Sequence, residues 1–262
     1  MRINFYKYHG TGNDFIMIDD RENLLRLSEE QVRLICDRHF GIGGDGLIRI
    51  LKSKEADFEM VYYNSDGRLG SMCGNGGRCT VAFAHFLGMI KTTTRFKAFD
   101  GLHDADIISS SPYIVKLKMS DVAKIRIHSG FTLLDTGSPH YVRFDENVKK
   151  LDVYSLGKEI RYSNSYREKG VNVNFVEVEE NGLFVRTYER GVEDETLSCG
   201  TGVTASVIAA VELEKWTDGS PCAVITPGGK LRVYFTEFND TYTDVWLEGP
   251  AEAVFSGQIA LD

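Results

Sequence analysis

The sequence lacks a long apolar run, and it also lacks a run of positive charge. A helix needs about 20 mostly apolar residues to cross a bilayer, and no stretch of the 262 residues comes near that length. The opening residues, MRINFYKYHG, do not contain the apolar core of a secretory signal peptide. With 30 Lys and Arg against 38 Asp and Glu, the net charge is −8, so we expect no nucleic-acid partner. The sequence therefore predicts a cytoplasmic protein that does not bind membranes.

Cysteines are few and odd in number, which argues against a purely structural disulfide framework. In the cytoplasm we expect them to be thiols. The spacing from Cys73 to Cys79 does not suit zinc, and no C-x2-C or H-x3-H pair accompanies it, so no metal is expected. We interpret three of the five as packing residues: Cys36, Cys79 and Cys222.

The other two cysteines, Cys73 and Cys199, each open a Cys-Gly-x-Gly stretch, 199 − 73 = 126 residues apart. MCGNGGRC continues into TVAFAHFLG, and SCGTGV continues into TASVIAAVELEK. Both continuations are apolar on nearly every side of a helix, which is typical of buried helices. We therefore expect two buried helices, each starting directly after a cysteine.

Further similarities between the two halves indicate a duplication. Thr11 of GTGND and Thr136 of DTGSPH lie 136 − 11 = 125 residues apart. Tyr63 of VYYNSDG and Tyr188 of RTYERGV lie 188 − 63 = 125 residues apart. Repeats at a fixed period indicate a repeated structural unit, whereas chance similarity among glycine-rich turns is the alternative.

The expected fold class is α+β, with two pseudo-symmetric domains. Each domain is expected to contain a mostly antiparallel sheet wrapped around its buried central helix. The first domain is expected over residues 1–118, with residues 250–262 returning to it. The second is expected over residues 119–249.

The motif GIGGDG (Gly41–Gly46) matches the G-x-G-x-x-G pattern of dinucleotide sites, but its context does not. A capping box at Ser28 and Gln31 predicts a helix through LSEEQVRLICDRHF just before the motif, with His39 on its apolar face. A strand-like segment, LIRILK, follows. In a dinucleotide site the strand comes first and the helix second, so we expect no dinucleotide here.

A cysteine at a helix start lies in a favourable place for acid/base chemistry. The first N–H groups of a helix and its partial positive charge bind carboxylates and favour thiolate. If the two copies direct Cys73 and Cys199 at one point in a cleft between the domains, an amino-acid α-carbon held there lies between two sulfurs. One thiolate can then remove the α-proton while the opposite thiol returns one, which inverts the centre without a cofactor.

The motifs HGTGNDF, YYNSDG, MCGNGGRC, SPH, VNVNF, YERG and ETLSCGTG occur in this order. In these motifs, and over nearly its whole length, the chain resembles the diaminopimelate epimerase family. The resemblance implies an isomerase independent of pyridoxal phosphate. It would convert LL-2,6-diaminopimelate to the meso form, for lysine and peptidoglycan synthesis. It implies Cys73 and Cys199 as the acid/base pair, a small-molecule substrate, no cofactor, and a homodimer as a further option.

The resemblance also implies how the substrate is held. Backbone N–H groups bind the reacting carboxylate, at Gly74, Asn75, Gly200 and Thr201. The side chains that bind the distal carboxylate and amine are Asn13, Asn64, Asn172, Glu189 and Arg190. His140 and Glu189 resemble residues that adjust the acidity of the cysteines.

The sequence departs from the family pattern at three places. Gly46 stands where the family usually has Gln, and Ser138 stands where it usually has Asn. One extra residue lies between YERG and Cys199. Because Gly46 has no polar side chain, we expect the far end of the substrate to be bound differently, while the two-thiol chemistry is unaffected.

Three alternatives stay open at this point. The first is another amino-acid racemase, such as a relative of proline racemase, and the second is a dithiol redox enzyme. The third is a catalytically inactive module that binds anions. Exchange of the substrate α-proton in deuterated water separates them, because a redox enzyme or an inactive module gives none.

Overall fold

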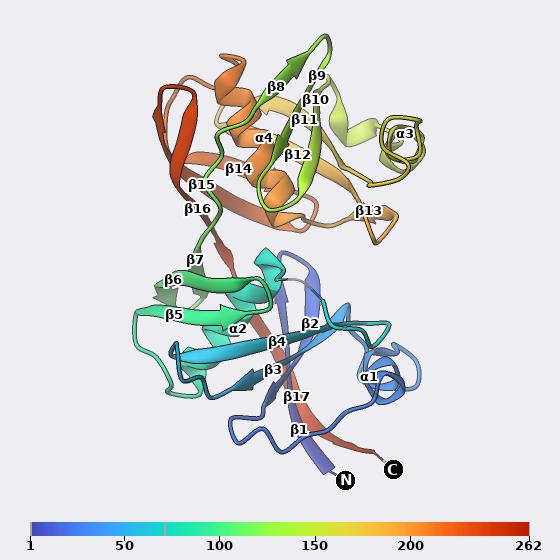
Figure 1. Ribbon diagram of the computed structural model, residues 1–262, viewed down its shortest axis with the longest axis vertical. Helices are drawn as coiled ribbons and strands as arrows, with labels where there is room; N and C mark the ends of the chain where they lie inside the picture. Colours follow the sequence, from blue (N-terminus) through green and yellow to red (C-terminus); the bar gives the residue numbers. More distant parts are fainter. Residues whose placement is uncertain (1, 71, 262) are drawn as a thin grey trace. The chain divides into compact units, whose positions relative to one another are not determined.

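A computed structural model describes residues 2–70 and 72–261 of the chain. Contacts within the chain divide it into two compact units, Met1–Leu117 with Gly249–Asp262, and Lys118–Glu248. Each unit is an α+β structure in which strands surround a central helix, as the sequence predicts (Figure 1). None of the helices in the described residues is long and apolar enough to cross a bilayer.

The sheet of the first unit is mostly antiparallel. Its strand order is β17-β1-β2-β3-β4-β5-β6-β7, with parallel pairing at β2–β3 and β4–β5. Figure 1 shows the blue strand β1 beside the red strand β17, so the end of the chain returns to its beginning. The strands are β1 (Arg2–Gly10), β2 (Asn13–Asp19), β3 (Gly46–Leu51), β4 (Phe58–Asn64), β5 (Thr93–Ala98), β6 (Gly101–Ser110), β7 (Tyr113–Lys118) and β17 (Glu252–Ala260).

The second unit repeats this arrangement. Its strand order is β8-β9-β10-β11-β12-β14-β15-β16, with parallel pairing at β10–β11 and β12–β14, and β13 pairs with the end of β12. The strands are β8 (Arg126–His128), β9 (Phe131–Asp135), β10 (Pro139–Phe144), β11 (Asn172–Glu179), β12 (Gly182–Glu189), β13 (Asp194–Thr196), β14 (Cys222–Thr226), β15 (Gly229–Phe238) and β16 (Thr241–Pro250).

The two units thus have the same succession of parallel and antiparallel neighbours, which is the duplication that the sequence indicates. β17 has the place in the first unit that β8 has in the second. The first unit is therefore completed by a strand from the other end of the chain.

A helix lies between the strands of each parallel pair, because parallel strands need a crossover connection. The helices are α1 (Glu29–Cys36) between β2 and β3, α2 (Gly74–Phe86) between β4 and β5, α3 (Val153–Arg161) between β10 and β11, and α4 (Gly200–Glu212) before β14. A short 3-10 turn, η1 (Val148–Lys150), precedes α3.

Helix α1 begins as predicted and ends earlier. Ser28 and Gln31 form the capping box. The predicted continuation through His39 is wrong, because the helix ends at Cys36 and His39 is exposed. The Asp37 carboxylate accepts hydrogen bonds from the backbone N–H groups of residues 39 and 40, each at 2.7 Å. Such local side-chain bonds compete with the helical ones and end the helix.

The long helices α2 and α4 form the cores of their units. Every residue of α2 from Gly74 to Ala84 is buried, as is every residue of α4 from Gly202 to Ala210. α2 packs against β1, β2, β3, β4 and β6, and α4 packs against β9, β10, β11, β12, β14 and β15. This confirms the two buried central helices.

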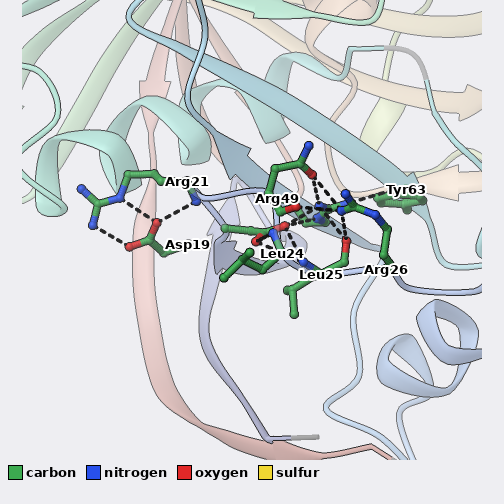
Figure 2. A network of polar contacts seen from close by, with 9 residues as sticks. Asp19, Arg21, Leu24, Leu25, Arg26, Arg49 and Tyr63 are labelled. Carbon is green, nitrogen blue, oxygen red and sulfur yellow. Dashed lines mark hydrogen bonds and ion pairs between the residues drawn. The ribbon is translucent and has the colours of Figure 1, made fainter.

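A buried ion pair fixes the connection from β2 to α1 (Figure 2). The guanidinium of Arg49 on β3 pairs with Asp20 and donates to Asn23 Oδ1 at 3.0 Å. The Asp20 carboxylate accepts from Leu24 N at 2.8 Å, and Arg49 also donates to the Tyr63 hydroxyl at 3.3 Å. A buried pair persists when its remaining hydrogen-bonding groups are satisfied, so this network holds the loop in place.

Matched glycines three residues after each cysteine allow a direct test of how the helices are packed. A Cβ on Gly202 would lie 2.4 Å from the buried Asn174 Oδ1, whereas a Cβ on Gly76 would lie 3.2 Å from the flexible Ile48 Cδ1. Alanine gains about 1 kcal/mol over glycine in a helix, but overpacking costs about 1–3 kcal/mol. We expect Gly202→Ala to lower the thermal midpoint measured by circular dichroism, and Gly76→Ala to change it less. The reverse ranking would contradict this packing.

Candidate active site

Each of the two cysteines occupies the N-cap position of a buried helix. Cys73 precedes α2 with φ −106° and ψ 128°, and Cys199 precedes α4 with φ −115° and ψ 111°. Oxygen-bearing side chains are preferred at this position because they accept from the first N–H groups of the helix. In the described structure neither sulfur makes such a capping hydrogen bond. Both helix starts are therefore suited to an anionic ligand.

A group of polar side chains surrounds Cys73 at the start of α2. Asn13 Oδ1 lies 3.5 Å from Cys73 Sγ and accepts from Asn75 Nδ2 at 3.4 Å. Asn13 Nδ2 donates to Asp45 Oδ2 at 2.6 Å. Because a carboxylate only accepts, Asp45 orients the Asn13 amide with its oxygen toward Cys73. Arg38 donates to Asp45 at 2.9 Å and holds it in turn.

A buried cation lies beneath the same helix start. Arg78 is fully buried and donates to Asn75 Oδ1 at 2.8 Å, Thr11 Oγ1 at 3.3 Å and Pro250 O at 3.3 Å. Burial lowers the pKa of Arg78, yet a guanidinium stays charged in proteins. The matched position in α4 is Thr204, so α4 has no cation at the place that Arg78 has in α2.

The structure explains why Gly46 stands where the family usually has Gln. A Cβ on Gly46 would lie 2.4 Å from Tyr62 Cε2, and one on Gly70 would lie 2.5 Å from Tyr62 Cε1. The Tyr62 ring therefore fills the space that a side chain at Gly46 would need. Asn64 pairs with Gly46 in the ladder and is exposed at the end of β4. Within the described residues, no hydrogen bond joins the Asn64 side chain to the group around Cys73.

The start of α4 is tied to a turn that matches one in the first unit. Cys199 is 7% exposed, and its Sγ lies 3.5 Å from Thr201 Oγ1. Thr136 donates its hydroxyl proton to Thr201 O at 2.9 Å. Thr11, the duplicate of Thr136, likewise reaches Asn75 Oδ1 at 3.4 Å. In both units the threonine of the repeated motif contacts the second residue of the buried helix.

Arg190, Asn172 and Ser138 form a second polar group in this unit. The Arg190 backbone N–H donates to Asn172 Oδ1 at 2.8 Å, and Asn172 Nδ2 donates to Ser138 Oγ at 2.9 Å. Arg190 Nη2 also donates to Ser138 Oγ, at 3.3 Å. Ser138 thus accepts from both partners, although the family usually has Asn in its place.

Glu189 ends β12, and a turn at residues 190–193 leads from it to β13. The Glu189 carboxylate accepts from Thr196 Oγ1 at 2.9 Å. The turn contains Glu193 in the left-handed region, with φ 59°. Glu193 accepts from Gly191 N at 3.1 Å and pairs with Arg161 at 3.2 Å, which fixes the turn.

His140 is fully buried on β10. Burial, and next the positive charge of Arg190, lower the pKa of His140 to about 3. The ring is therefore neutral near pH 7. Its Nδ1 contacts Asn174 Nδ2 at 3.1 Å. Sequence reasoning missed Asn174, for which the only signal was a second polar residue in the strand VNVNF.

The other three cysteines, Cys36, Cys79 and Cys222, are also buried. Burial raises the pKa of Cys36, Cys79 and Cys222 to about 12 each. Their thiols stay protonated at physiological pH, in agreement with a packing role. The described residues contain no group of three or more His, Cys, Asp or Glu side chains that could hold a metal ion.

Similarity to known proteins assigns the family. The family model described as diaminopimelate epimerase matches residues 5–124 and 132–254. The diaminopimelate epimerase of Flavobacterium psychrophilum is 49% identical over 259 residues, which cover 98% of this chain and 100% of that protein. The chain belongs to the diaminopimelate epimerase family. The diaminopimelate epimerase of Chlorobaculum tepidum is 43% identical over 260 residues, covering 96% and 99% of the two chains.

This confirms the family and the isomerase class predicted from the motifs. Solved structures with lower identity share the fold. A Bacillus anthracis phenazine biosynthesis protein of the PhzF family has a TM-score of 0.75 at 16% identity, with both chains covered fully. A hydroxyproline epimerase from Agrobacterium vitis has a TM-score of 0.71 at 15% identity, covering 100% of this chain and 92% of that one. The predicted α+β fold with two domains is confirmed.

The contact between Asp45 and Asn13 leads to a testable prediction for this epimerase family member. Asp45→Ala frees the Asn13 amide to rotate, so we expect slower epimerisation of diaminopimelate, followed by coupled assay or NMR. In an Asn13→Ala background the same change should have much less effect, with a coupling energy of about 0.5–3 kcal/mol. Asp104→Ala is the matched control, because Asp104 is paired with Arg95 at the surface of the same unit. Additive effects of the two substitutions would contradict positioning through Asn13.

Proposed function

We propose that this chain interconverts LL-2,6-diaminopimelate and meso-diaminopimelate by moving an α-proton between Cys73 and Cys199. The observation that carries the proposal is the matched N-cap position of both cysteines in a member of this family. The reaction requires both sulfurs to reach the same α-carbon, one on each face.

The reacting carboxylate is bound by the first N–H groups of the two buried helices, at Gly74 and Asn75 of α2 and at Gly200 and Thr201 of α4. These groups and the helix dipoles stabilise the negative charge that moves onto the carboxylate when the α-proton leaves. Their rigid burial helps, because donors that are already in place need no reorganisation during the reaction.

The proton transfer balances without any other reactant. A thiolate takes the α-proton, so the C–H bond breaks, an S–H bond forms and the electron pair stays on the substrate as an enolate. The thiol on the opposite face then gives its proton to the α-carbon and becomes a thiolate. The stereocentre is inverted, and the two cysteines have exchanged roles for the reverse reaction.

The distal end of the substrate is held by polar side chains of both units. The Arg190 guanidinium, supported by Asn172 and Ser138, suits the distal carboxylate because it can donate two parallel hydrogen bonds. Asn13 offers its oxygen, since Asp45 engages its N–H, so Asn13 suits an ammonium group. Asn64 and Glu189 complete this set, and His140 and Glu189 adjust the acidity of the cysteines.

We further propose that the two contact units, divided near residues 118 and 249, act as the two functional domains. The cytoplasm suits the reaction, because reducing conditions keep both thiols available. The active species is proposed to be a homodimer, and light scattering during size-exclusion chromatography of the active fraction tests that state.

Exchange in deuterated water tests the chemistry directly. We expect the reduced protein to incorporate deuterium at the α-carbon of LL-diaminopimelate and to form the meso isomer, followed by NMR. Cys73→Ser and Cys199→Ser should each lower the rate by about 10²–10⁴-fold, the usual contribution of a general acid or base. Cys36→Ala is the control and should keep the rate, since Cys36 lies at the end of α1.

Other outcomes distinguish the alternatives. Exchange with L-proline or trans-4-hydroxy-L-proline, and none with diaminopimelate, would replace the proposed substrate. Turnover with thioredoxin or peroxide and no α-proton exchange would indicate a dithiol redox enzyme. Full activity of both serine variants would remove the two-thiol mechanism.

A further inference from the structure

A row of three buried polar side chains crosses adjacent strands of the second unit. His140 lies on β10, Asn174 on β11 and Thr187 on β12, with 0%, 0% and 2% of their surfaces exposed. A Cβ on Gly202 would lie 2.4 Å from Asn174 Oδ1 and 3.3 Å from Thr187 Oγ1. Asn174 and Thr187 therefore lie directly against the first turn of α4, which begins after Cys199, and His140 contacts Asn174.

The orientation of the Asn174 amide is determined by its neighbours. One end lies 3.1 Å from the carbonyl oxygen of Tyr141, which can only accept, so this end is the NH₂ group. The other end accepts the hydroxyl proton of Thr187 at 2.9 Å. The Tyr141 carbonyl assigns the orientation, and the Thr187 hydroxyl, which can donate or accept, is satisfied by it.

This orientation decides where the His140 ring carries its proton. The same Asn174 Nδ2 lies 3.1 Å from His140 Nδ1. An amide nitrogen only donates, so Nδ1 must accept and carries no proton. The proton of the neutral ring is then on Nε2, which is buried and has no hydrogen-bond partner within the described residues.

We propose that Asn174 and Thr187 are positioning residues that hold His140 in the Nε2–H tautomer, so that His140 acts as a neutral hydrogen-bond donor and not as a base. The tautomer follows from the contacts alone, whereas the part His140 plays in epimerisation rests on the proposed function.

Two further observations agree with a neutral donor. Protonation of the ring would place a hydrogen on Nδ1 as well as on Nε2, and the Nδ1 hydrogen would face the NH₂ group of Asn174. Burial and the nearby Arg190 charge also disfavour the imidazolium form. A buried N–H group without a partner is rare in proteins, and it suits an anion that forms or arrives during the reaction. A substrate carboxylate and a thiolate are both of that kind.

Nitrogen NMR of the uniformly ¹⁵N-labelled full chain at pH 7 tests the tautomer. The His140 signals are assigned by their loss in His140→Gln. We expect a protonated Nε2 and an unprotonated Nδ1. A proton on Nδ1, or on both nitrogens, would overturn the proposal without any measurement of activity.

Asn174→Asp tests the role, because a carboxylate can only accept and should move the ring proton to Nδ1. We expect that spectral change together with a loss of about 10–100-fold in kcat, the range found for residues that orient metal-binding histidines, and little change in KM. Thr187→Val keeps the Tyr141 contact, so it should keep the tautomer and lose less activity. Asn239→Asp makes the same chemical change at an exposed turn and should alter neither measurement.

The outcomes separate the claims. An unchanged tautomer in Asn174→Asp would reject the positioning by Asn174. A changed tautomer with wild-type kcat would reject the donor role of His140. If Asn174→Asp does not fold, Asn174→Leu removes the donor at similar volume, and a ring that stays wholly Nε2–H there would also reject it. If the wild-type protein does not epimerise diaminopimelate, the proposed function fails while the NMR result still decides the tautomer.

Discussion

The buried starts of α2 and α4 are the constraint on which the rest of the structure depends. Backbone N–H groups at a helix start need acceptors, and a protein usually supplies one from an N-cap oxygen. Here a cysteine occupies that position in both units. Glycines leave the first turns of both helices with few side chains, and the strands around α4 place buried polar side chains against it. The same arrangement, which would be costly in an ordinary core, leaves the start of each helix without a capping side-chain oxygen.

Groups that only accept or only donate determine the geometry around each helix start. The Asp45 carboxylate orients the amide of Asn13, and the Asn174 amide faces Nδ1 of His140, where we propose that it sets the tautomer. Neither Asp45 nor Asn174 has to touch a ligand to do so. An amide has two nearly equivalent orientations and a neutral imidazole has two tautomers. A single neighbour of fixed polarity selects one of them in each case.

The sequence predicted the features that have a strong periodic or repeated signal. Helices apolar on every side and motifs 125 or 126 residues apart were sufficient to infer the duplicated fold and the buried helices. Helix α3 was missed, although Asp152 caps it by accepting from Ser155 N at 3.0 Å, because its short pattern resembles a polar loop. The sequence could not predict that the Tyr62 ring fills the space beside Gly46, because side-chain contacts between neighbouring strands depend on the strand register. The roles of Asp45 and Asn174 depend on contacts of the same kind.

The return of β17 to β1 has a consequence for how the protein is made. Domains generally fold as units while the chain emerges from the ribosome. The second unit is continuous in sequence and is complete once residue 248 has been synthesised, but the first unit still lacks an edge strand at that time. The half of the molecule that is translated first is therefore the half that matures last, and β1 waits with an unpaired edge for the final residues.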